Sequence, residues 1–269
     1  MLGFYNRLSS EVYDLDKPIG HSFGDVEFYK QRLLLHKGKI LEPAVGTGRI
    51  LIPLLESGLQ VEGYDSSPEI LRICQNNCQK KGLSPTLFEA TMETYASPNL
   101  YQAIIIPAGT FLLIHEREAS IKALQNFYHS LENGGKLIID LFLQTEFSFG
   151  TISTRTWTCD NADVITYQDT LVEVDYINQY SISYGRYEKW RNGTLVETEL
   201  ERFPLRWYGV EEFRMILEKI GFQQIIISAD YQFQANPTNT TKIITFEAIA
   251  NKAGKADVNV KTGAISYDM

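Results

Sequence analysis

Short apolar runs alternate with amphipathic stretches over residues 40–143, and this order restricts the possible fold more than any other feature. The expected strands cover residues 39–42, 60–64, 86–90, 102–107 and 136–143. The expected helices cover residues 49–58, 67–82 and 118–132, and the Asn-Gly-Gly at 133–135 is expected to end the last one. Continuous apolar runs are typical of parallel strands that are covered on both faces. The order therefore predicts an α/β fold with an open, doubly wound, mostly parallel sheet.

The pattern changes between about 151 and 208. Apolar and polar residues alternate there, no helix is indicated, and Asn192-Gly193 is a strong hairpin signal. A helix at 210–221 and strands at 222–228 and 241–250 follow, and the two strands are expected to form an antiparallel hairpin at the sheet edge. We therefore expect an α/β domain formed by 1–150 and 209–250, an inserted antiparallel β-sheet at 151–208, and a polar C-terminal tail at 251–269.

The overall charge narrows the range of partners. The 269 residues carry a net charge of −8 and show no Lys/Arg cluster, so nucleic acid is not expected as a partner. No transmembrane span or signal peptide is visible, so no membrane contact is expected. Three cysteines in a chain of this size indicate a reducing, cytoplasmic location.

The stretch "ILEPAVGTGRI" at 40–50 joins the first strand to the first helix through glycines at 46 and 48. Ligands of open α/β sheets bind at this end of the strands, and Asp65, which ends the second strand, could accept both hydroxyls of a ribose. Two adenosine cofactors then compete. A dinucleotide fingerprint needs a small residue where Leu51 stands, and Glu42 would be a poor neighbour for a pyrophosphate. Glu42 instead favours a cation, such as the amino group of S-adenosylmethionine.

This loop and four further segments resemble the class I S-adenosylmethionine-dependent methyltransferases. The segments are "VEGYDSS", "FEATMETY", "IIIPAGTFLLI" and "LENGGKLIIDLF". The resemblance covers roughly 25–145 and 205–250, and it implies a Rossmann-like methyltransferase fold with S-adenosyl-L-methionine as cofactor. The cofactor-binding residues that it implies are Glu42, Pro43, Ala44, Gly46, Gly48, Asp65, Ser66, Thr91, Met92, Pro107 and Ala108.

Two positions depart from the family pattern. Ala44 replaces the first glycine of the loop motif, and Thr91 stands where many members have an aspartate that bonds the adenine amino group. A hydroxyl would make that bond more weakly, while the main-chain amide of Met92 could still serve the ring. By the same resemblance, Tyr13 and Tyr29 are candidates to close over the methionine end. Packing of an N-terminal helix is the alternative for both tyrosines.

The acceptor is expected to be a small molecule. Inserted sheets of this kind resemble those of small-molecule N-methyltransferases, so an amine acceptor and a possible homodimer are expected. His115, which follows the fourth strand, is the candidate catalytic base. Its alternative role is to cap the next helix. O-methyl transfer to a hydroxylated acceptor, and a non-catalytic cofactor-binding module, remain open as alternatives.

Overall fold

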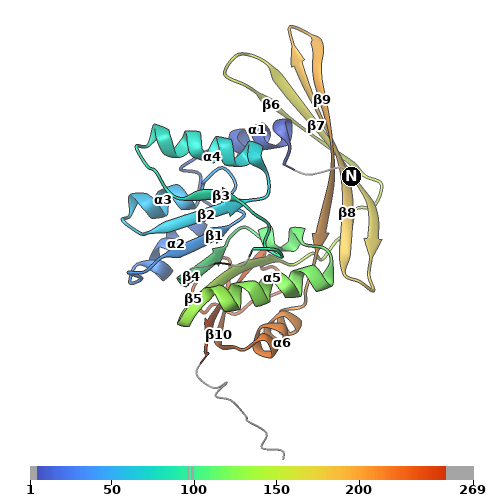
Figure 1. The fold of residues 1–269 in the computed structure, drawn as a ribbon. Helices are drawn as coiled ribbons and strands as arrows, with labels where there is room; N and C mark the ends of the chain where they lie inside the picture. The colour runs from blue at the N-terminus through green and yellow to red at the C-terminus, as the bar shows by residue number, and fades with distance from the viewer. Residues whose placement is uncertain (1–4, 96, 98–99, 253–269) are drawn as a thin grey trace, which may run out of the picture.

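The computed structural model describes residues 5–95, 97 and 100–252, and it places them in two β-sheets (Figure 1). The larger sheet has seven strands in the order β10-β11-β5-β4-β1-β2-β3. Its strands are β1 (Ile40–Pro43), β2 (Val61–Asp65), β3 (Leu87–Glu89), β4 (Tyr101–Ile106), β5 (Leu131–Phe142), β10 (Phe222–Ala229) and β11 (Ile243–Ala250). The smaller sheet has the order β6-β7-β8-β9. Its strands are β6 (Ile152–Thr158), β7 (Val164–Asp175), β8 (Tyr180–Arg191) and β9 (Thr194–Arg206).

Helices cover both faces of the seven-stranded sheet. The helices that cover it are α2 (Asp25–Leu33), α3 (Leu51–Glu56), α4 (Pro68–Lys80), α5 (Arg117–Ser130) and α6 (Val210–Ile220). A further helix, α1 (Arg7–Asp16), packs against α4 and the smaller sheet, and a 3₁₀ turn, η1 (Thr110–Leu113), follows β4. Apolar residues of α2, α3 and α4 pack with Ala103 and Ile105 of β4. Residues of α5 and α6 pack with Ile104 and Ile106 of the same strand. Neighbouring residues of one strand therefore enter opposite cores, which explains the continuous apolar runs.

The parallel, doubly wound order that was predicted is confirmed. β1 pairs in parallel with β2 and with β4, while β10 and β11 pair antiparallel at one edge. Helix α4 begins as expected, because the Ser67 hydroxyl accepts a bond from the Ile70 amide and Pro68 occupies the first turn.

The predicted end of α5 was wrong. The helix ends at Ser130, and Leu131 is already extended. Residues 133–135 lie in the first part of β5, where its register against β4 shifts between Tyr101 and Ala103. A β-bulge thus uses the glycines that were assigned to a helix stop.

The antiparallel sheet expected within 151–208 is present. Its β8–β9 hairpin turns at Asn192 and Gly193, whose φ angles are +49° and +75°. Positive φ at both central residues is what a type I′ turn requires, and Asn-Gly adopts it at the least cost. The tail residues 253–269 lie outside the described part of the chain.

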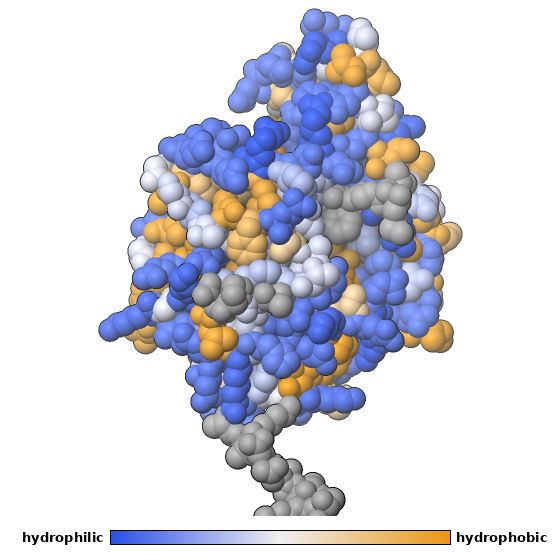
Figure 2. Space-filling view, viewed as in Figure 1, coloured by the Kyte–Doolittle hydropathy of each residue, from blue (hydrophilic) through white to orange (hydrophobic). Residues whose placement is uncertain are grey.

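Helix α1 connects the two sheets. It contacts α4 on one side and strands β6, β8 and β9 on the other (Figure 1). The face of the molecule in Figure 2 is mainly hydrophilic, with scattered apolar groups. Within the described residues, none of the helices combines the length and the apolar character needed to cross a membrane.

Candidate active site

A cavity of about 300 Å³ lies beyond the carboxyl ends of β1, β2, β3 and β4. The strand order reverses at β1, because β2 and β3 follow it on one side and β4 and β5 lie on its other side. The cavity therefore lies at the topological switch point of the sheet. Its wall includes Tyr5, Tyr13, Ala44, Gly46, Tyr64, Asp65, Ser66, Thr91, Met92, Thr110 and His115. The topology therefore brings together segments that are up to 110 residues apart in the chain.

The loop after β1 forms the floor of the cavity in a left-handed conformation. Ala44, Gly46 and Gly48 have φ angles of +51°, +58° and +88°. Ala44 therefore tolerates a conformation that favours glycine, which accounts for the glycine usual at that position of the motif. At Gly48 a Cβ atom would lie 3.0 Å from the Cys74 sulfur of α4. Gly48 thus allows the close approach of α4, while Gly46 faces the cavity.

Asp65 ties this loop to the end of β2. Its Oδ2 accepts a hydrogen bond from the Gly46 amide at 3.0 Å, and its Oδ1 accepts one from the Ser67 amide at 3.0 Å. Burial raises the pKa of the Asp65 carboxyl, and the bonds from the Ser67 and Gly46 amides limit that rise. A carboxylate can accept about four hydrogen bonds. The Ser66 amide also acts on this carboxylate, so Asp65 keeps room for about one further donor, such as a ligand hydroxyl.

Glu42 lies behind the loop rather than in the cavity wall. Its side chain is 2% exposed, and none of the described residues forms a hydrogen bond with its Oε2. Burial raises the pKa of Glu42 well above its usual range, although the Arg49 charge acts in the opposite direction. A buried carboxyl oxygen without a partner is costly, and a cationic group of a ligand would satisfy it.

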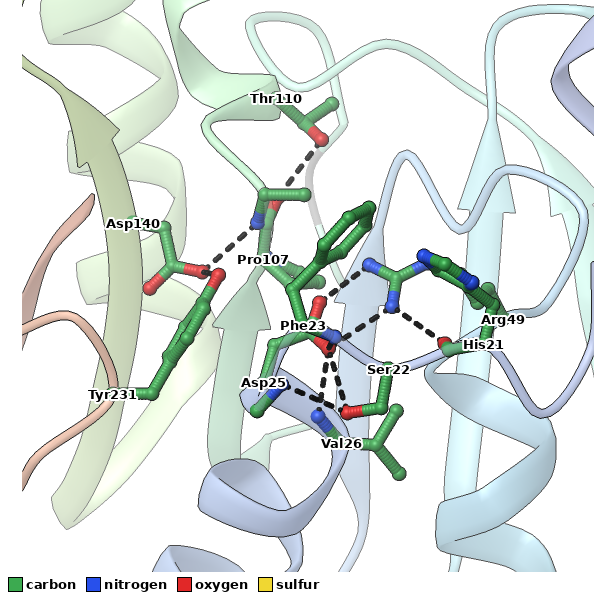
Figure 3. Close-up of polar contacts among 12 residues, drawn as sticks. His21, Ser22, Phe23, Asp25, Val26, Arg49, Pro107, Thr110, Asp140 and Tyr231 are labelled. Atoms are coloured by element: carbon green, nitrogen blue, oxygen red, sulfur yellow. Dashed lines mark hydrogen bonds and ion pairs between the residues drawn. The ribbon is translucent and has the colours of Figure 1, made fainter. Parts of the chain in front are cut away.

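Arg49, which the sequence patterns did not single out, holds the N-terminal segment against the loop (Figure 3). Its guanidinium donates to both carboxylate oxygens of Asp25, at 3.0 and 2.5 Å, and to the His21 carbonyl at 3.2 Å. Both charged side chains are almost fully buried. Burial alone would raise the pKa of Asp25, but the bonds from Arg49 outweigh it and the pKa lies below its usual range. The pair fixes the entrance to α2 beside the glycine loop.

Asp140 holds the loop that follows β4 (Figure 3). Its Oδ2 accepts from the Ala108 amide at 2.9 Å and from the Tyr231 hydroxyl at 3.0 Å, and its Oδ1 accepts from the Thr245 hydroxyl at 2.7 Å. Burial raises the pKa of Asp140 to about 6, although these bonds act to lower it. Ala108 has a φ of +57°, so Asp140 stabilises a strained residue. Pro107 and Ala108 lie behind the cavity wall, and Thr110 lies in it.

A turn after β3 forms the opposite wall. Thr91 and Met92 line the cavity there, and the Thr91 hydroxyl is bonded to that of Thr94 at 2.7 Å. The amide of Asn126, from α5, donates to the carbonyls of Met92 and Glu93 at 3.1 and 3.0 Å. Asn126 thus fixes this turn from 33 and 34 residues away, and no local pattern in the sequence predicted this contact.

His115 lies in the cavity wall one residue before Glu116, the N-cap of α5. Its Nε2 is 3.3 Å from the Glu116 carboxylate, and its ring meets Tyr180 edge-on at 5.6 Å. Burial lowers the pKa of His115, with Arg202 and Arg206 adding to this effect and Glu116 opposing it. The imidazole is therefore neutral near pH 7 and can accept a proton.

The predicted residues fall into two groups. Those in the cavity wall are Tyr13, Ala44, Gly46, Asp65, Ser66, Thr91, Met92 and His115. The lining residues do not include Tyr29, Glu42, Pro43, Gly48, Pro107 and Ala108. Tyr29 is fully buried with the apolar residues of α2. Tyr5, which the sequence did not indicate, lines the cavity beside Tyr13, and their rings meet edge-on at 5.6 Å.

Among residues 5–95, 97 and 100–252, no group of three or more His, Cys, Asp or Glu side chains is arranged to hold an ion. The cavity thus combines a glycine floor, the Asp65 carboxylate and the His115 imidazole.

Comparison with known proteins agrees with this geometry. Residues 40–135 match the family model described as a methyltransferase domain. A glycine/sarcosine N-methyltransferase from Aphanothece halophytica is 28% identical over 217 residues, covering 78% of this chain and 76% of that protein. A Clostridium acetobutylicum S-adenosylmethionine-dependent methyltransferase superposes with a TM-score of 0.71 at 17% identity, covering 90% of this chain and 97% of that one. A sugar N-methyltransferase from a Streptoalloteichus species gives 0.71 at 17% identity over 94% and 98%.

Proposed function

Because the chain is a class I S-adenosylmethionine-dependent methyltransferase, we propose that it transfers the methyl group to the nitrogen of a small-molecule amine. The observation that carries the proposal is one cavity that joins the glycine-and-acid floor to a neutral imidazole wall. The relative from Aphanothece halophytica, a glycine/sarcosine N-methyltransferase, supports the choice of nitrogen. The negative net charge agrees with a cationic acceptor.

The residues of the floor fit the cofactor. S-adenosylmethionine, when bound, supplies an electrophilic methyl group on a positively charged sulfur. We assign the ribose to Asp65, whose carboxylate lines the cavity and keeps room for a ligand hydroxyl beside its backbone donors. The unpartnered Oε2 of Glu42 would accept from the amino group, directly or through water. Gly46 lets the methionine part lie against the main chain, with Tyr13 covering it.

The turn after β3 is assigned to the adenine. Thr91 and Met92 line the cavity there, and Asn126 holds their backbone in place. Pro107 and Ala108 act indirectly, because Asp140 uses the Ala108 amide to fix the loop that leads to Thr110. This division separates residues that touch the cofactor from residues that position them.

His115 is proposed as the group that removes a proton from the acceptor. An amine that arrives as an ammonium ion has no lone pair for attack, so a neutral imidazole in the wall is a suitable base. The lowered pKa of His115 keeps it in that form near pH 7. Displacement at a sulfonium also depends on alignment, which the rigid strands β1, β2 and β4 provide.

Purified protein tests the proposal directly. Titration with S-adenosylmethionine and with NAD should give binding to the first only. Turnover is then measured on a panel of amines, hydroxy acids, sugars and phenols, with the methylated atom identified by mass spectrometry and NMR. Methylation of a nitrogen supports the proposal. Methylation confined to hydroxyl oxygens would establish the O-methyltransferase alternative, and cofactor binding without turnover on any class would favour a non-catalytic module.

A further inference from the structure

A second cavity, of about 400 Å³, lies between α1 and one face of the four-stranded sheet. Tyr5 and Tyr13 line this cavity as well as the first one. The two spaces therefore meet at a pair of tyrosine rings. The remaining wall comes from α1, β6, β7, β8 and β9, so the inserted sheet contributes most of it.

Glu201 is a buried acid in this second cavity. It lies on β9 and is 2% exposed. Its Oε1 accepts from the Tyr5 amide at 3.0 Å and its Oε2 from the Tyr187 hydroxyl at 3.1 Å, and both of these donors are neutral. Within residues 5–95, 97 and 100–252, no Lys, Arg or His nitrogen lies within 4.0 Å of this carboxylate.

Burial without a cation disfavours the charged form of Glu201. Burial raises the pKa of Glu201 to about 7, although the bonds from Tyr5 and Tyr187 act to lower it. An ionised carboxylate inside a protein is stabilised when a cation comes within contact distance. A positively charged ligand in this cavity would supply that missing partner.

Aromatic rings form the adjoining wall. The rings of Tyr167 and Tyr187 lie 4.4 Å apart, centroid to centroid, at an angle of 32°. Gly185 makes room for them, since a Cβ atom there would lie 2.6 Å from the Tyr167 ring. Tyr167 also donates its hydroxyl to Asp169 at 3.2 Å, which adds a second carboxylate to the wall. Tyrosine faces beside carboxylates are the surroundings that organic ammonium ions prefer.

Two basic residues also line the cavity. Arg155 is paired with Asp16 at 3.3 Å and lies over the Tyr167 ring at 5.9 Å, while Lys17 lies over the Tyr13 ring at 4.9 Å. The described residues that line the cavity include three carboxylates and two basic groups, so they carry one negative charge in excess when all are ionised.

Resting on the proposed function, we infer that the second cavity binds the methyl acceptor and selects it as a small organic ammonium ion. Glu201 would hold the charge and the Tyr167–Tyr187 pair would contact the alkyl groups. The proposal concerns binding of the acceptor, and it leaves removal of the proton to His115. The shared tyrosines place the bound nitrogen at the border with the cofactor cavity.

An isosteric pair of probes tests this inference. The full chain is first saturated with S-adenosylhomocysteine. Choline and its uncharged isostere 3,3-dimethylbutan-1-ol are then titrated into it separately, and their affinities are measured by calorimetry. We expect choline to bind about tenfold more tightly, because only choline carries the charge. Glu201→Gln should remove most of this preference while it keeps the size of the side chain, and Asp169→Asn should reduce it.

Glu199→Gln is the matched control, since Glu199 lies two residues away on the same strand and caps α1 instead. It should keep the preference. Equal affinity of the wild type for the two probes, or a preference unchanged in both Glu201→Gln and Asp169→Asn, would overturn the inference. The comparison of the two probes on the wild type needs no variant, so it tests the inference even if Glu201→Gln fails to fold. Failure to bind S-adenosylhomocysteine would instead count against the proposed function.

Discussion

The two sheets differ in what they bury. The seven-stranded sheet is covered on both faces by apolar cores that include Leu41, Ile104 and Phe246 on one side and Ile40, Ile105 and Ile138 on the other. The four-stranded sheet covers only a small apolar cluster against α1, formed around Leu8, Ile165 and Tyr167. The seven-stranded sheet is therefore held mainly by apolar packing, whereas the four-stranded sheet needs additional, polar contacts.

Hydrogen bonds and ion pairs attach α1 to the four-stranded sheet. Glu199 accepts bonds from the Leu8 and Ser9 amides at the start of α1, at 2.7 and 3.0 Å. Lys189 pairs with Glu11 at 2.7 Å, and the Trp157 indole donates to Asp16 at 3.2 Å. These contacts are directional and can be exchanged singly, whereas a change in a close-packed core disturbs its neighbours. The first sheet thus fixes the floor of the proposed cofactor site, and single contacts of the second sheet can change while that floor is kept.

The largest expected effect is on the catalytic rate, from a change in the wall of the first cavity. His115→Ala should lower kcat by roughly 10²–10⁴ and leave cofactor affinity nearly unchanged, if the imidazole takes the acceptor proton. The wild-type rate should rise with pH and level off once His115 is neutral, and this occurs below the usual histidine range because its pKa is lowered. His129→Ala, at the far end of α5, is the control. A normal kcat in His115→Ala would rule out the base.

The buried ion pair beneath the loop should contribute next. Asp25→Asn leaves the Arg49 guanidinium buried without its counter-charge, so the free energy of unfolding should fall by about 3–5 kcal/mol. Arg7→Gln breaks a half-exposed pair with Glu197 at the second sheet, and it should cost less than about 1 kcal/mol. Urea denaturation measures both. An equal loss of unfolding free energy in both variants would contradict the proposed difference between the two regions.

Cofactor affinity gives a smaller effect. Asp65→Ala removes a charged acceptor and should weaken S-adenosylmethionine binding by about 1.5–3 kcal/mol, which is roughly 10- to 150-fold in Kd. Glu62→Gln, on the same strand but paired with Lys39, should leave Kd unchanged. Calorimetry that finds equal affinity in Asp65→Ala and the wild type would refute the ribose assignment.

The smallest effect is expected at the second sheet. Glu199→Gln weakens the acceptor at the start of α1, and its loss of charge at a helix N-terminus should lower stability by about 0.5–2 kcal/mol. Cofactor affinity should remain normal, because Glu199 lies outside the first cavity. A variant that loses cofactor binding together with stability would mean that the two regions are more tightly coupled than their packing indicates.

Local signals in the sequence predicted most of the fold. The apolar runs, the helix signal that starts at residue 67 and the Asn192-Gly193 turn each act over a few residues, and their structures were confirmed. The glycines at 133–135 misled, because glycine serves a bulge as readily as a helix stop.

The candidate site was predicted less completely. Motif positions such as Asp65, Gly46 and Thr91 do line the cavity. The Arg49–Asp25 pair and the Asn126 contact join residues 24 to 34 positions apart, and neither leaves a periodic pattern in the chain. Tertiary placement alone could reveal them. The expected homodimer and the cytoplasmic location stay predictions.

The cap of α1 by Glu199 has a consequence for how the chain folds during its synthesis. The helix lies at the start of the chain, but the carboxylate that satisfies its first amides is 190 residues further on. At roughly 5–20 residues per second, a ribosome needs roughly 10–40 s to span that interval. Contacts of such high contact order form late, after the loop between them has closed. The helix that carries Tyr13 to the cofactor loop thus reaches its final position only when β9 has emerged.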